Sequence, residues 1–164
     1  MPNALAAPRA SRLALVDIDG VLADTRHSDE HAIARRWGDY FSLMHLDGVW
    51  RQGFDLVECI EMCEFELAYL TGRREDTRDT TKDWLRRHRF PKATLLMRPI
   101  PDRRPLADLK ASIVREAAGR YPQGVRLWDD DPYVIDAVNR TLPGAGRRCT
   151  WYIKPQSIAK RANV

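Results

Sequence analysis

Two carboxylates stand at the end of an apolar run near the N-terminus. The stretch LALVDIDGVLAD, residues 13–24, leads hydrophobic side chains directly into Asp17 and Asp19. Burying unpaired charge is costly, so a fold that collects carboxylates at this point needs a chemical reason for it. Side chains of this kind can act as a nucleophile or as a general acid and base. Asp17 is a candidate for the nucleophile and Asp19 a candidate for the general acid and base.

Three more carboxylates occur together much later in the chain. They belong to the stretch LWDDDP and are Asp129, Asp130 and Asp131. If all five carboxylates share one site, they cannot all stay ionised without compensation. Oxygen ligands suit Mg²⁺, which also keeps part of its coordination sphere for waters and a substrate phosphate. The acidic residues therefore predict a magnesium site that serves phosphoryl chemistry.

A second set of residues suits the phosphate group itself. Thr71 and Gly72, in the stretch LTGR, stand where a predicted strand gives way to a helix. A hydroxyl and free backbone N–H groups at a helix N-terminus form a cradle for an anion. Lys110, on a later predicted helix, is placed to neutralise phosphate oxygens.

Each of these stretches also has an ordinary explanation when it is taken alone. An Asp-x-Asp pair occurs by chance, a single helical lysine is usually solvated, and DDDP is compatible with an acidic helix cap. What favours the chemical interpretation is that each stretch follows or feeds a predicted strand.

The elements that must position these residues alternate between strands and helices. Strands are predicted at residues 13–17, 65–72, 93–98, 125–130 and 149–153. Helices are predicted at residues 28–37, 55–64, 75–89, 106–120 and 132–142, with an irregular stretch at 38–53. This alternation predicts an α/β fold with a mostly parallel sheet sandwiched by helices. Ligands of such sheets bind beyond the carboxyl ends of the strands, where the acidic stretches and LTGR would meet.

The bulk properties of the chain indicate one globular domain over residues 13–164. Residues 1–12 contain no apolar core of signal-peptide length and predict a short disordered lead-in. No apolar run approaches the roughly 20 residues that a membrane helix needs, so we expect no membrane association. The net charge of +4 and the pI of about 9.1 are compatible with a polyanionic partner.

The three cysteines are Cys59, Cys63 and Cys149. An odd number without a secretion signal favours a reducing compartment, and we expect a cytoplasmic protein. Cys59 and Cys63 lie four residues apart on one face of a predicted helix. We expect them to be buried by packing, because no further soft ligands for a metal are visible nearby.

The order of the motifs resembles that of the haloacid dehalogenase superfamily of phosphohydrolases. The matching residues are DIDGVL, LTGR, Lys110 and LWDDDP. Within that superfamily, the stretch from LTGR to Lys110 is similar to the 3′-phosphatase domain of phage-type polynucleotide kinases. The resemblance implies a Rossmann-like core with a small cap, here within about residues 25–53. It also implies an aspartyl-phosphate intermediate and one Mg²⁺ ion.

The resemblance also implies a role for each matching residue. Asp17 would attack phosphorus, and Asp19 would protonate the leaving hydroxyl and then activate water. The metal would be held by Asp17, the backbone carbonyl of Asp19 and Asp129, with Asp130 in support. Thr71 and Lys110 would bind the phosphoryl oxygens. Substrate-binding residues would include Gly72, Arg73 and Arg98, of which Arg73 would help to orient the substrate.

Two departures from the kinase-linked phosphatases limit the resemblance. These proteins commonly place an arginine after the paired aspartates, where this chain has Asp131, which puts specificity for polynucleotides in doubt. In addition, no glycine is followed by lysine, so the chain contains no P-loop of the form G-x-x-x-x-G-K-[ST]. A kinase or ligase that works with this chain would therefore be a separate protein.

Three functions remain open at this stage. The first is removal of the 3′-phosphate from nucleic-acid ends, since a small cap leaves the site accessible to a chain end. The second is a nucleotidase acting on free nucleotides, which would use the same catalytic residues. The third, a non-catalytic metal-containing binding module, would need only the acidic residues.

Overall fold

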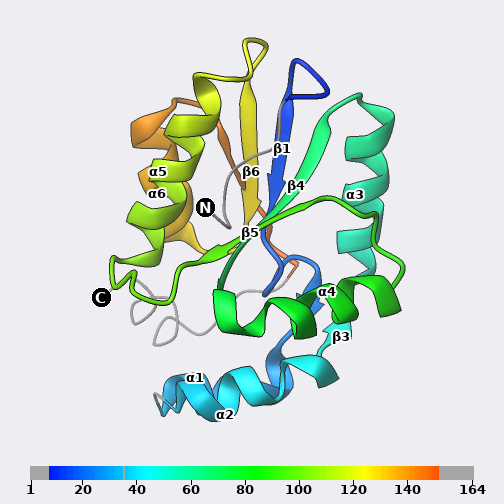
Figure 1. The fold of residues 1–164 in the computed structure, drawn as a ribbon, viewed down its shortest axis with the longest axis vertical. Coiled ribbons are helices and arrows are strands. Elements are labelled where there is room, and N and C mark those ends of the chain that lie inside the picture. The colour runs from blue at the N-terminus through cyan, green and yellow to red at the C-terminus, as the bar shows by residue number, and fades with distance from the viewer. Residues whose placement is uncertain (1–7, 35, 152–164) are drawn as a thin grey trace.

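A computed structural model describes residues 8–34 and 36–151. Its main sheet contains five parallel strands in the order β5-β4-β1-β6-β7 (Figure 1). The strands are β1 (Leu13–Val16), β4 (Glu66–Arg74), β5 (Thr94–Arg98), β6 (Val125–Asp129) and β7 (Gly146–Arg148). This is the predicted α/β arrangement, and it brings the carboxyl ends of β1, β4 and β6 to the same edge of the sheet.

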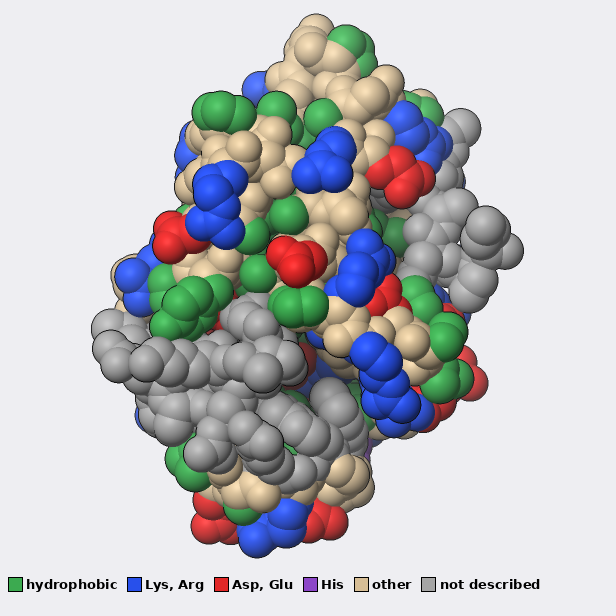
Figure 2. All heavy atoms as spheres, turned by 90° about the vertical axis from the view of Figure 1, so that its left-hand side faces the viewer, with side chains coloured by type: hydrophobic (Ala, Val, Ile, Leu, Met, Phe, Trp, Pro, Cys, Tyr) green, Lys and Arg blue, Asp and Glu red, His purple; other side chains and the backbone are tan. Residues whose placement is uncertain are grey.

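Helices cover both faces of this sheet, as expected. One face carries α5 (Leu106–Ala118) and α6 (Pro132–Thr141), and the other carries α3 (Arg51–Met62) and α4 (Arg78–Arg87) (Figure 1). The outer surface over α5 and α6 mixes hydrophobic side chains with interspersed basic and acidic ones (Figure 2). No helix in the described part of the chain is long and apolar enough to cross a membrane.

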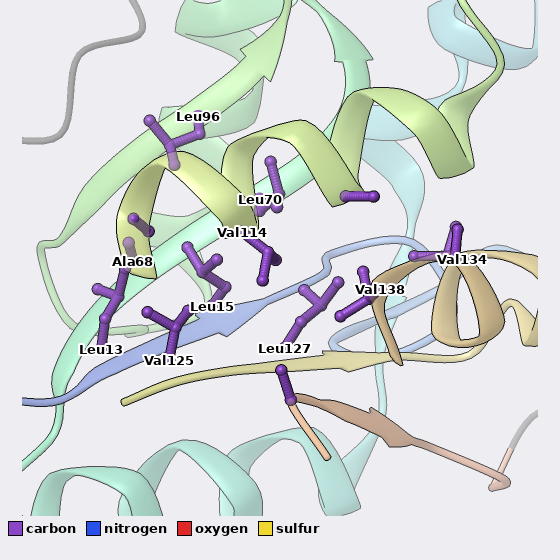
Figure 3. Close-up of a cluster of buried hydrophobic side chains, with 14 of the residues drawn as sticks. Leu13, Leu15, Ala68, Leu70, Leu96, Val114, Val125, Leu127, Val134 and Val138 are labelled. Carbon is purple, nitrogen blue, oxygen red and sulfur yellow. The ribbon is translucent and has the colours of Figure 1, made fainter. Parts of the chain in front are cut away.

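The central strand β1 supplies side chains to both hydrophobic cores. Successive residues of a strand point to opposite faces, so Leu13 and Leu15 enter one core and Ala14 and Val16 the other. All four are fully buried, which explains why this stretch is apolar without alternation. Figure 3 shows the first core, where side chains of β1, β4, β5 and β6 meet those of α5 and α6.

A small group of elements lies beyond the carboxyl ends of the strands (Figure 1). Strands β2 (Ala23–Asp24) and β3 (Gly48–Val49) pair in an antiparallel fashion and enclose the stretch between them. That stretch contains η1 (Arg26–Ser28), α1 (Asp29–Ile33), α2 (Trp37–Ser42) and η2 (Met44–Leu46). We call residues 25–47 the α1–α2 segment.

Several predicted boundaries are wrong. In place of the single helix predicted at residues 28–37, the chain forms the last residue of η1, the short helix α1 and the first residue of α2. The stretch predicted as irregular contains the rest of α2, η2, β3 and the start of α3. The last strand is Gly146–Arg148 instead of 149–153, and residues 152 and 153 lie outside the described residues. In the predicted lead-in, the backbone N–H of Arg9 donates to the Glu66 carboxylate, and the Arg12 side chain donates to the backbone carbonyl of Cys63.

The prediction that Cys59 and Cys63 are buried is also wrong. Both are exposed, whereas Cys149 is buried, and all three cysteines are free. Their helix α3 buries Val57 and Ile60 instead, so the face that packs on the sheet differs from the face that carries the two thiols.

Candidate active site

Lys110 lies between two aspartates that come from opposite ends of the chain. Its Nζ is 2.9 Å from Oδ2 of Asp17 and 2.7 Å from Oδ2 of Asp129. The ammonium group is fully buried. Burial alone would lower the pKa of Lys110, but the charges and hydrogen bonds of Asp129 and Asp17 raise it above its usual value. Lys110 is therefore held in the charged form that a phosphoryl group would need.

Three carboxylates converge beside this lysine. One oxygen each from Asp17, Asp129 and Asp130 lies within 4.8 Å of the others, and all three side chains are buried. Lys110 offsets only one of these three negative charges. A divalent cation that prefers oxygen ligands fits the negative charge that remains and the carboxylate oxygens that surround it.

Gly20 makes room for this cluster, and the sequence analysis assigned it no role. Its φ of +86° is a conformation that side chains disfavour. A Cβ atom at this position would lie 2.3 Å from Oδ2 of Asp130. The signal was present in the motif, because Gly20 directly follows the aspartate pair in DIDG.

Asp131 serves as a helix cap. Its side chain accepts a hydrogen bond of 2.8 Å from the backbone N–H of Tyr133, at the start of α6. Its own backbone N–H donates to Oδ1 of Asp129 at 2.9 Å. The acidic-cap explanation considered for DDDP therefore holds for the last of the three aspartates, while the first two belong to the cluster.

Asp19 is held on the other side of the site by Arg73. The guanidinium donates to Oδ1 of Asp19 from Nε at 3.0 Å and from Nη2 at 2.6 Å. Arg73 is 1% exposed, whereas the Asp19 side chain remains 13% exposed. Arg73, which was expected to orient the substrate, is thus enclosed by the protein. Its contacts favour an indirect role, in which it orients Asp19.

A further carboxylate, Asp47, contacts the same guanidinium from the α1–α2 segment. Its Oδ2 accepts from Nη2 of Arg73 at 2.7 Å, and the side chain is 2% exposed. Burial and the nearby charge of Asp19 raise the pKa of Asp47 to about 8, although Arg73 acts to lower it. Asp47 belongs to none of the sequence motifs, and no pattern in the sequence points to it.

The remaining predicted site residues, Thr71, Gly72 and Arg98, differ in the groups that they contact. Thr71 is fully buried, and its hydroxyl accepts from the backbone N–H of Arg73 and donates to Asp19 at 3.4 Å. Gly72 packs closely on Leu106 at the start of α5, where a Cβ would lie 3.1 Å away. Arg98 instead donates to the backbone carbonyls of Asp102 and Arg104 and fixes the loop before α5.

Comparisons of the sequence find no counterpart: no protein-family model and no curated protein matches the chain. Solved structures do match. A chain of the Pnkp1/Rnl/Hen1 RNA repair complex aligns with a TM-score of 0.70 at 21% identity and covers 90% of this chain. This chain spans only 45% of the length of that protein.

Two further structures match over most of their own length. A haloacid dehalogenase-like hydrolase from Streptococcus pneumoniae aligns with a TM-score of 0.60 at 16% identity, covering 93% of this chain and 91% of its own. A class C acid phosphatase from Bacillus anthracis, with tungstate bound, gives 0.61 at 13% identity and covers 90% and 68%. The chain therefore has the fold of the haloacid dehalogenase superfamily, as its motifs suggested.

Proposed function

We propose that this protein is a magnesium-dependent phosphomonoester hydrolase. The observation that carries the proposal is Lys110, fully buried and bound to both Asp17 and Asp129 beside Asp130. Assembling this group costs the desolvation of four charged side chains, and a packing role alone would not require it. The hydrolases and phosphatase with the same fold agree with this chemistry.

In the proposed reaction, Asp17 is the nucleophile. One of its oxygens forms a bond to phosphorus as the bond from phosphorus to the leaving oxygen breaks, which gives an aspartyl-phosphate. Asp19 donates a proton to the leaving oxygen and then takes a proton from the water that hydrolyses the intermediate. The products are an alcohol, inorganic phosphate and the regenerated Asp17.

Lys110 and the metal would balance charge during this transfer. Lys110 and Thr71 are the residues proposed to bind phosphoryl oxygens. Asp17, Asp129 and Asp130, with the backbone carbonyl of Asp19, would hold Mg²⁺. When bound, the ion would draw negative charge from the phosphoryl oxygens.

The substrate we favour is the 3′-phosphate of a nucleic-acid end. The match to a component of an RNA repair complex supports this choice, as does the small size of the α1–α2 segment, which we propose acts as the cap. A free nucleotide is the second candidate, because it would use the same residues. We further propose a cytoplasmic protein that works with a separate kinase or ligase.

A substrate panel tests these proposals. Oligonucleotides with a 3′-phosphate, oligonucleotides with a 5′-phosphate, and nucleoside monophosphates are incubated with the protein and Mg²⁺, and released phosphate is measured. We expect the fastest release from the 3′-phosphorylated oligonucleotide. Preference for mononucleotides would support the nucleotidase, and absence of turnover on all three would support a binding module.

The Asp17→Asn variant provides the first testable prediction. An amide is a poor nucleophile, so we expect turnover to disappear while circular dichroism and melting temperature show a folded protein. The same substrate panel measures this loss. Retained hydrolysis in the variant would remove Asp17 from the nucleophile role.

A further inference from the structure

Arg73 joins two carboxylates that come from different parts of the fold. Nη2 donates to Oδ1 of Asp19 at 2.6 Å and to Oδ2 of Asp47 at 2.7 Å. Asp19 follows β1 in the core, whereas Asp47 ends the α1–α2 segment. The guanidinium lies between them almost without solvent contact. Asp19 and the α1–α2 segment are thus connected through a single buried side chain.

Asp47 is fixed by the core as well as by Arg73. Its backbone carbonyl accepts a hydrogen bond of 2.9 Å from Nε1 of the buried Trp84 on α4. The Trp84 ring lies 5.8 Å from the Arg73 guanidinium carbon, within the range of a cation–π contact. The main chain of Asp47 therefore contacts α4, and its side chain contacts Arg73 on β4. Together these contacts fix the position of the carboxylate.

The three charged side chains differ in their exposure to solvent. Arg73 and Asp47 are almost completely enclosed, whereas the Asp19 side chain is 13% exposed. A carboxylate at the rim of a site would have several accessible rotamers if nothing held it. Arg73 restricts Asp19 to one of them. The same Nη2 donates to Asp47, so the Asp47 carboxylate holds the buried guanidinium from the side of the α1–α2 segment.

We propose that Asp47 is a positioning residue for the proton-transfer step. It holds Arg73 in place, and Arg73 holds Asp19 in the orientation that delivers a proton to the leaving oxygen. The inference rests on the proposed phosphatase activity. It assigns the α1–α2 segment a second task besides covering the site, because an undocked segment would remove Asp47 from Arg73.

The test compares two substrates that differ in their need for a proton. Leaving phenolates such as 4-nitrophenolate depart without protonation, whereas an alkoxide from an alkyl phosphate does not. The second-order constant kcat/KM reports the steps up to formation of the aspartyl-phosphate. For Asp47→Ala we expect kcat/KM to fall about tenfold more for an alkyl phosphate, such as a nucleoside 3′-phosphate, than for 4-nitrophenyl phosphate.

Two matched variants separate positioning from simple loss of docking. Asp47→Asn retains an oxygen that accepts from Arg73, so we expect its ratio of the two kcat/KM values to return close to that of wild type. Arg87→Ala removes a bond of 3.0 Å from Arg87 to the backbone carbonyl of His45, in the same turn, without touching Arg73. We expect its ratio to equal that of wild type.

The outcomes are distinct. An unchanged ratio in a folded Asp47→Ala variant would overturn the inference and leave the phosphatase proposal standing. Failure of the wild-type protein to hydrolyse these two substrates and the 3′-phosphorylated oligonucleotide as well would remove both proposals. If Asp47→Ala does not fold, Trp84→Phe replaces it, because it deletes the N–H donor to the Asp47 backbone carbonyl and keeps an aromatic side chain in the core. An unchanged ratio in Trp84→Phe would then overturn the inference.

Discussion

At the scale of single residues, the site depends on the contacts between the Lys110 ammonium group and the carboxylates beside it. The Lys110 ammonium group contacts both Asp17 and Asp129. Its removal takes away the positive charge that lies between these two buried carboxylates. Breaking a buried ion pair by deleting one partner typically costs about 3–5 kcal/mol.

We therefore predict that Lys110→Met lowers the free energy of unfolding by about 3–5 kcal/mol in the absence of metal. Added Mg²⁺ should recover part of this loss, because the ion supplies positive charge at the same carboxylates. Urea denaturation with EDTA or with Mg²⁺ measures both effects, and Lys82→Met, an exposed lysine on α4, is the control. Equal stability of the two variants would contradict the central position of Lys110.

A second residue-scale prediction concerns Gly20. A methyl group there would collide with the Asp130 carboxylate and would occupy a backbone conformation that disfavours side chains. We expect Gly20→Ala to weaken Mg²⁺ binding at least about tenfold by displacing Asp130, an effect equivalent to roughly 1.4 kcal/mol. Isothermal titration calorimetry measures the affinity. Gly38→Ala, where a Cβ meets nothing within 4 Å, should bind the ion as wild type does.

At the scale of elements, the strand ends and helix starts place the functional groups. Helix α6 begins where β6 ends, and Asp131 caps it while its backbone N–H supports Asp129. Helix α5 delivers Lys110 from the face that it buries against the sheet. Both helices thus contribute to the stability of the fold and to the site. Replacing the Asp131 side chain removes the helix cap and keeps the backbone N–H that donates to Asp129, so it separates these two contributions.

We predict that Asp131→Ala lowers stability by about 0.5–2 kcal/mol, the usual loss for an N-cap side chain. Activity should remain within about threefold of wild type, because the backbone donor to Asp129 is unchanged and the effect falls on the cap. Thermal unfolding and steady-state kinetics check the two parts. A large loss of activity without loss of stability would show that the Asp131 side chain acts on substrate instead.

At the scale of the whole molecule, the acidic cluster connects segments from both ends of the sequence. Asp17 directly follows β1, whereas Asp129 ends β6, the strand that pairs with β1, and Asp130 comes next in the chain. A cation bound by all three would join these segments in the folded state and would have no equivalent site in the unfolded chain. Ion binding is therefore linked to folding stability.

We predict that Mg²⁺ raises the melting temperature of the wild-type protein and that EDTA reverses this. At a concentration of 100 times Kd the gain is about 2.7 kcal/mol. Asp130→Asn should reduce the gain, because it removes one of the three charges. Identical melting curves with Mg²⁺ and with EDTA would contradict a metal site at this cluster.

Much of this arrangement was predictable from the sequence. Short apolar runs that end in Asp17, Thr71 and Asp129 indicated buried parallel strands. Because the carboxyl ends of parallel strands lie at one edge of the sheet, the three residues were expected to lie close together. The α1–α2 segment was harder to predict. Its elements are short and lack strong periodicity, so the single helix and the irregular stretch expected there were wrong.

What the sequence by itself determined is the order of strands and helices and the type of chemistry their ends can perform, because both follow from local apolar patterns and residue types. The tertiary structure decided which side chains pair. It placed the Arg73 guanidinium between Asp19 and Asp47 and made Gly20 necessary beside Asp130. These contacts join residues distant in the chain, and they depend on side-chain directions in a packed interior that no one-dimensional pattern records.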